Sequence, residues 1–225
     1  MSETTTIKVI TFDCYGTLID WDKGIKGFFK EILPDKNQQL IDNIIKRWET
    51  IQFQLIQGKY LPYEELQNRS FAQTFSQFNI SNKYNLGKKL LEKIPFWNSF
   101  PDVYPVLSPL ENRYKLVLIS NGPLSILKAN AQNMGIEFDE IISAEQIKAY
   151  KPSLEVFQYS LKKLNTKVTE ILHIAAGYKY DVIPAETLGI TTVWVNRKGI
   201  LPPGDIIPDY EITKLVDLHQ ISNYS

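Results

Sequence analysis

Thr11-Phe12-Asp13-Cys14-Tyr15-Gly16-Thr17-Leu18 is the stretch that decides the fold. It ends the apolar run Ile7–Phe12 and places a carboxylate, Asp13, directly before a turn that contains glycine. An unpaired carboxylate is strongly disfavoured inside a sheet. The carboxyl end of a parallel strand, by contrast, is where open α/β folds bind ligands. Asp13 is therefore a candidate nucleophile.

The composition indicates a globular protein. The 225 residues are 44% hydrophobic and 12% aromatic, which fits one large domain or a core with an insertion. The 25 basic and 25 acidic residues cancel, so neither nucleic acid nor an anionic membrane is favoured as a partner. A single cysteine excludes an internal disulfide and fits a reducing compartment. Without a signal peptide or an apolar run of about 20 residues, we expect a soluble cytoplasmic protein.

The chain divides into two patterns. Residues 22–95 read as helical, with apolar side chains three and four apart from Ile41 to Leu55. From about residue 96, short apolar runs alternate with helical stretches, which is typical of a parallel sheet with right-handed crossovers. The predicted strands after the first are 116–119, 141–142, 171–175 and 191–195, and predicted helices include 123–134 and 153–164.

These patterns predict an α/β fold in two parts. A doubly wound, Rossmann-like parallel sheet forms a core domain of residues 1–20 and 96–225. Residues 21–95 form an α-helical cap domain inserted after the first strand, so a cleft would lie over Asp13. A homodimer is compatible with an apolar cap face, but the sequence shows no interface.

Polar side chains also stand near the ends of other predicted strands and helices, and together they could serve one reaction. Lys151, before Pro152, carries an ammonium that would keep Asp13 ionised. The Ser120 hydroxyl and the start of the next helix could bind an anion. Asp181 supplies a second carboxylate that could position or deprotonate water.

The order Asp13-Cys14-Tyr15-Gly16-Thr17, Ser120-Asn121-Gly122, Lys151-Pro152 and Asp181 resembles the four motifs of the haloacid dehalogenase superfamily. Most members of that superfamily are magnesium-dependent phosphatases. They carry a second aspartate where this chain has Tyr15, and an acidic metal ligand where it has Ala176. The resemblance therefore implies neither a metal nor another cofactor here.

The same departures resemble the L-2-haloacid dehalogenase branch. That resemblance implies a hydrolase in which Asp13 attacks C2 of an (S)-2-haloacid, displaces halide and forms an ester. Water then hydrolyses the ester to an (R)-2-hydroxy acid. Two alternatives stay open: a phosphatase or phosphomutase with an altered magnesium site, and a non-catalytic binding module.

The resemblance also implies residue roles. The motif positions predicted to be catalytic are Asp13, Thr17, Arg47, Ser120, Asn121, Lys151 and Asp181, with Arg47 receiving the halide from the cap. An apolar wall for the substrate is predicted from Tyr15, Trp48, Ile51, Tyr63, Tyr178 and Tyr180. Ala176, Tyr178 and Phe157 stand where the branch often has serine, asparagine and tyrosine, which bears on rate and substrate range. Cys14 and His173 are expected to serve packing.

Overall fold

The computed structural model describes residues 6–81 and 85–221, and its centre is a six-stranded, wholly parallel sheet. The strands run in the order β3-β2-β1-β4-β5-β6, so β2 and β3 lie on one side of β1 and β4 to β6 on the other. This arrangement confirms the predicted doubly wound fold and puts the end of β1 at the topological switch point. The strands are β1 Val9–Phe12, β2 Lys115–Ser120, β3 Glu140–Ser143, β4 Ile171–Ala175, β5 Thr191–Val195 and β6 Tyr210–Ile212.

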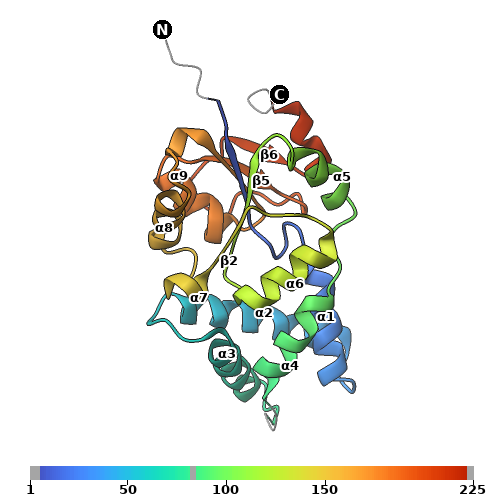
Figure 1. The fold of residues 1–225 in the computed structure, drawn as a ribbon. Coiled ribbons are helices and arrows are strands. Elements are labelled where there is room, and N and C mark those ends of the chain that lie inside the picture. Colours follow the sequence, from blue (N-terminus) through green and yellow to red (C-terminus); the bar gives the residue numbers. More distant parts are fainter. Residues whose placement is uncertain (1–5, 82–84, 222–225) are drawn as a thin grey trace.

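Helices cover both faces of the sheet (Figure 1). On one side lie α5 (Val103–Leu107) and α6 (Leu124–Met134), and on the other α8 (Leu154–Leu164) and α9 (Ile183–Thr187). The short helix α7 spans Ala144–Ile147. The 3₁₀ segments are Ile94–Phe96, Ser108–Leu110, Val168–Glu170 and Leu215–Gln220, and a π-helical turn covers Tyr178–Val182.

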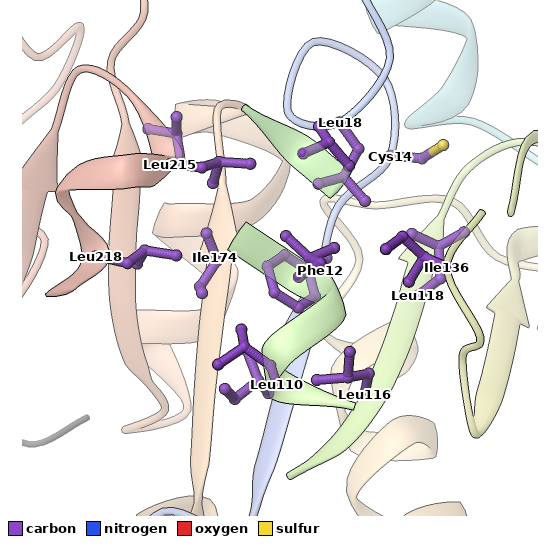
Figure 2. Close-up of a cluster of buried hydrophobic side chains, with 14 of the residues drawn as sticks. Phe12, Cys14, Leu18, Leu110, Leu116, Leu118, Ile136, Ile174, Leu215 and Leu218 are labelled. Atoms are coloured by element: carbon purple, nitrogen blue, oxygen red, sulfur yellow. The ribbon is translucent and has the colours of Figure 1, made fainter. Parts of the chain in front are cut away.

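Alternation along the strands divides the core between these two faces. Phe12 points into the cluster that holds α5 and α6, whereas Val9 packs with the side of α8 and α9. Figure 2 shows Phe12 among side chains from neighbouring strands, including Leu118 and Ile174. Cys14 is fully buried in the same cluster, as its predicted packing role requires.

Among the described residues, four helices lie between β1 and α5, and we call them the cap helices. They are α1 (Trp21–Ile32), α2 (Gln38–Ile56), α3 (Tyr63–Gln77) and α4 (Leu86–Lys93), which gather beyond one end of the sheet (Figure 1). Asn37 starts α2 because its side-chain oxygen accepts a hydrogen bond from the Leu40 N–H at 2.9 Å. Their apolar faces meet around Trp48 and Phe71, whose rings stack 5.4 Å apart. The predicted domain boundaries near residues 20 and 96 stay a prediction.

The described helices are too short or too polar to cross a bilayer. Among them α2, with 19 residues, is long enough, but its inward stripe of isoleucines alternates with charged and amide side chains.

Candidate active site

Three charged side chains meet at the carboxyl end of β1. The Lys151 ammonium donates hydrogen bonds to Asp13 Oδ1 at 2.8 Å, to the Ile119 carbonyl at 2.9 Å and to Asp181 Oδ1. Lys151 is only 1% exposed, and both carboxylates are buried. An ammonium has three N–H donors, and all three are used within the protein. Lys151 is therefore fixed between the two carboxylates and has no N–H left for a ligand.

Thr17 holds the other oxygen of the candidate nucleophile. Its hydroxyl donates to Asp13 Oδ2 at 2.7 Å and accepts a hydrogen bond from the Ala176 N–H at 2.8 Å. The turn between Asp13 and Thr17 requires Gly16, whose φ of +86° lies in the region that other residues rarely adopt. The turn thus brings the Thr17 hydroxyl into hydrogen-bond contact with the carboxylate of Asp13, four residues earlier.

The three charges have unequal acidities. Burial raises the pKa of Asp13, and Lys151 and Thr17 oppose that rise only in part. For Asp181, burial acts in the same direction, but Lys151 and His173 outweigh it and lower the pKa. Burial would lower the pKa of Lys151, yet the two carboxylates raise it. Lys151 therefore stays charged, and Asp13 is the more basic and more nucleophilic carboxylate of the pair.

Ser120 and Asn121, at the end of β2, complete the edge of the sheet. The Asn121 amide accepts from the Lys151 N–H at 2.7 Å and donates to the Lys151 carbonyl at 3.0 Å. Asn121 therefore clamps the backbone of Lys151 and fixes where its side chain starts. Ser120 is buried, and its oxygen accepts from the Gly122 N–H at 3.4 Å.

A cavity of about 570 Å³ opens over this edge, between the sheet and the cap helices. The core side contributes the predicted site residues Asp13, Tyr15, Ser120, Asn121, Lys151, Tyr180 and Asp181. The cap side contributes Tyr63, as predicted, together with Glu49 and Gln52 from α2. Tyr15 is oriented by its hydroxyl, which donates to Asn130 Oδ1 at 3.2 Å.

Two predicted cap residues lie elsewhere on α2. Arg47 does not line the cavity, because its Nε donates to Gln77 Oε1 of α3 at 2.6 Å. Trp48 is fully buried in the core of the cap. The face of α2 toward the cavity carries positions 49, 52 and 56, so residue 48 lies beside that face and residue 47 on the opposite side of the helix.

Two further substrate contacts are also displaced from the predicted wall. Ile51 is 1% exposed and does not line the cavity. Tyr178 turns away from the cavity, because its hydroxyl donates to the Ile206 carbonyl and its ring packs against Trp194. Other apolar side chains, including Ile56, Leu66 and Phe100, line the cavity in their place.

His173 is buried in β4 as expected, but it contacts the site directly. Its Nε2 lies 3.1 Å from Asp181 Oδ1, and its Nδ1 lies 2.7 Å from the Thr11 hydroxyl. A chain of contacts thus runs from Thr11 through His173, Asp181 and Lys151 to Asp13. A buried histidine needs a polar partner, so the position of His173 inside an apolar strand was the one sign in the sequence that it contacts a polar group.

The donor set does not fit a magnesium ion of the kind used by phosphatases of the superfamily. Magnesium takes oxygen ligands in octahedral geometry, whereas Ala176 offers no side-chain oxygen at the position of the acidic ligand, and Tyr15 replaces the aspartate that serves as general acid. Within residues 6–81 and 85–221, no group of three or more histidine, cysteine, aspartate or glutamate side chains could hold a metal.

Known proteins resemble this chain in sequence and in fold. A family model described as haloacid dehalogenase-like hydrolase matches residues 7–189. (S)-2-Haloacid dehalogenase 1 of Pseudomonas sp. (strain CBS-3) is 24% identical over 224 residues, which cover 96% of each chain. The crystal structure of L-2-haloacid dehalogenase RSc1362 has a TM-score of 0.84 at 23% identity, covering 96% of this chain and 98% of that one.

A further solved structure is that of L-2-haloacid dehalogenase from Xanthobacter autotrophicus with chloropropionic acid covalently bound. It has a TM-score of 0.80 at 20% identity and covers 96% of this chain and 98% of its own. At these identities the likeness between structures establishes a shared fold.

Proposed function

The chain belongs to the haloacid dehalogenase-like hydrolases, and we propose that it converts (S)-2-haloalkanoic acids to (R)-2-hydroxy acids and halide. The observation that carries the proposal is that the Asp13–Lys151 pair lies in a site where Ala176 and Tyr15 replace the acidic metal ligand and the second aspartate of a magnesium-dependent phosphatase. Relatives named (S)-2-haloacid dehalogenase match along almost the whole chain, which supports the same substrate class.

The first step uses the basic carboxylate of Asp13. One of its oxygens attacks C2 of the substrate opposite the halogen, and the carbon–halogen bonding pair leaves with the halide. The product is an ester between Asp13 and C2, with the configuration at C2 inverted. Thr17 and Lys151 hold the two carboxylate oxygens and limit the angles from which the substrate can be attacked.

The second step returns Asp13 to its starting form. Water attacks the ester carbonyl of Asp13, and Asp181, which Lys151 and His173 keep ionised, accepts a proton from that water. The bond between the carbonyl carbon and the oxygen on C2 then breaks, and the alkoxide takes up that proton. The 2-hydroxy acid keeps the oxygen that came from Asp13, and Asp13 keeps one oxygen from water.

The experiment is halide release from each enantiomer of 2-chloropropionate, with and without chelator. We expect release from the (S)-enantiomer only, at the same rate with chelator, and a loss of at least about 10³-fold in Asp13→Asn because the nucleophile is removed. Asp42→Asn is the matched control, because Asp42 is exposed on α2 and bonds to Gln38.

Isotope labelling tests the intermediate. Under single turnover in heavy-oxygen water, mass spectrometry should find the label in Asp13 and none in the first molecule of hydroxy acid. Halide release without label in Asp13 would rule out the ester. Magnesium-dependent release of phosphate from a phosphomonoester, without halide release, would instead favour a phosphatase.

A further inference from the structure

The cap wall of the cavity presents a carboxylate that has no partner. Glu49, on α2, lines the cavity, and no hydrogen bond or ion pair links its carboxylate to the described residues. Burial raises the pKa of Glu49, as does Asp22 of α1, while Lys198 and Lys26 oppose them. Lys198 pairs with Asp22 at 2.5 Å and not with Glu49. A half-buried carboxylate in this setting is stabilised by any group that donates a hydrogen bond to it.

A second unsatisfied group lies one turn further along α2. The side-chain Nε2 of Gln52 is buried and has no hydrogen-bond partner among the described residues. Gln52 follows Glu49 by three positions, so both side chains project from the same face of the helix into the cavity. The wall thus offers one strong acceptor and one donor side by side.

The cavity is larger than a short haloacid needs. Its volume of about 570 Å³ lies within the roughly 300–1,000 Å³ of pockets for drug-sized ligands, whereas 2-chloropropionate has only about six non-hydrogen atoms. A C3 substrate held at Asp13 would leave the cap wall in contact with water alone.

We propose that the substrate extends from C2 to the cap wall and carries there a neutral group that both donates and accepts hydrogen bonds, a hydroxyl or a carboxamide. This group donates to the Glu49 carboxylate and accepts from an N–H of the Gln52 amide, which rotation about the last bond of the side chain brings to the cavity. The inference rests on the proposed function for the reacting end of the substrate.

Other terminal groups match the wall less well. A second carboxylate would meet the like charges of Glu49 and Asp22, and the cavity-lining Lys198 already pairs with Asp22. An ammonium would bind Glu49 but would leave the Gln52 N–H groups without an acceptor. An alkyl terminus would bury both polar groups unpaired, and a buried unpaired polar group costs the full desolvation penalty.

The test is a binding comparison that needs no turnover. Titration calorimetry would compare unbranched carboxylic acids of four to six carbons with the matching acids that carry a terminal hydroxyl or carboxamide. We expect the polar acid of the best length to bind wild-type protein about tenfold more tightly than its alkyl parent, the change expected for one hydrogen bond to a charged group.

Two variants and one control locate the effect. Glu49→Leu and Gln52→Leu should each remove most of the preference for the polar acid, and the alkyl parent should bind more tightly because it no longer buries that polar group unpaired. Gln54→Leu is the matched control, because Gln54 is exposed on the same helix and does not line the cavity. It should keep the full preference.

Equal binding of polar and alkyl acids by the wild type, no binding of the polar acids, or a preference that survives both variants would each overturn the inference. The proposed function is judged separately by halide release. Halide release without the preference removes this inference alone, and the preference without halide release removes dehalogenation alone.

Discussion

The Lys151 ammonium donates its three hydrogen bonds to Asp13, to Asp181 and to the Ile119 carbonyl, so it has none left to donate to a ligand. The acidity of Asp13 then depends on a balance between burial, which raises its pKa, and the hydrogen bonds that stabilise its ionised form. The Thr17 hydroxyl donates one of those hydrogen bonds. Replacing Thr17 with valine removes this hydroxyl with little change in shape, since the two side chains are nearly equal in size.

We expect Thr17→Val to move the acid limb of the kcat/KM profile to higher pH. The Thr17 hydrogen bond lowers the pKa of Asp13, so its loss lets that pKa rise further. The nucleophile must be ionised, and activity is therefore lost at a higher pH as the solution is made acidic. The maximal rate should also fall, by about tenfold for one lost hydrogen bond to a charged group.

A pH–rate profile of halide release measures this shift. Thr187→Val serves as the control, because the Thr187 hydroxyl is exposed and bonds only within α9, to the Ile183 carbonyl at 2.7 Å. An acid limb that stays in place, or moves to lower pH, would show that Thr17 does not set the acidity of Asp13.

At the scale of elements, the segment after β4 decides where Asp181 lies. The chain enters a π-helical turn, Tyr178–Val182, before α9 begins, where the sequence predicts only a helix. The Asp181 N–H donates to the Gly177 carbonyl at 2.7 Å, which ties the carboxylate to the end of β4. Gly177 has an ordinary negative φ, so its small size, and not its backbone conformation, is what the turn uses.

We expect Gly177→Ala to displace Asp181. A Cβ at this position would overlap Asp181 Oδ2, and the carboxylate would have to move away from Lys151 and His173. If Asp181 takes the proton from water, hydrolysis of the ester should slow by about 10²-fold or more while its formation is less affected. The measurement is a burst of halide release under rapid mixing, followed by a slow steady state.

The control is Gly27→Ala on the exposed side of α1, where nothing lies within 4 Å of an added Cβ. It should leave the kinetics unchanged and stabilise the protein by roughly 0.5–1 kcal/mol, as alanine does in a helix interior. Equal slowing of both steps in Gly177→Ala would contradict a specific role of Asp181 in hydrolysis.

At the scale of the whole molecule, the cavity exists because the cap helices are held over the sheet edge. One such contact is the Tyr150 hydroxyl, which donates to the Leu61 carbonyl between α2 and α3 at 2.8 Å. The Tyr150 ring also stacks on Tyr60, with centroids 5.2 Å apart. Tyr150 immediately precedes Lys151, so the same short segment carries both the cap contact and the central ammonium.

We expect Tyr150→Phe to loosen the cap over the cavity. The lost hydrogen bond should cost about 0.5–1.5 kcal/mol of stability and raise KM by about threefold, with a smaller change in kcat because the charged groups stay in place. Urea unfolding and steady-state halide release measure the two effects.

Tyr159→Phe is the control, since Tyr159 lies on α8 and does not line the cavity. Both tyrosines lose only a hydroxyl, so equal changes in KM would show that the Tyr150 contact has no special part in cap placement.

The sequence by itself determined the sheet and the group of polar residues at its edge. Strands of four or more residues with apolar runs, such as β1 and β2, were predictable, whereas β6, with three residues including Glu211, had no such signal. The carboxyl ends of parallel strands meet at one edge whatever the details of packing, which is why Asp13, Ser120 and Asp181 could be expected to gather. Their catalytic roles stay predictions.

Only the tertiary structure decided which side of the cap faces that edge. The apolar stripe of α2 predicts what packs inside the cap, but a helix has two flanks beside such a stripe, and sequence does not say which meets the core. The fold turns Glu49 and Gln52 toward the cavity and Arg47 toward Gln77. In the same way it pairs His173 with Asp181, because contacts between distant elements depend on how their surfaces dock and not on local pattern.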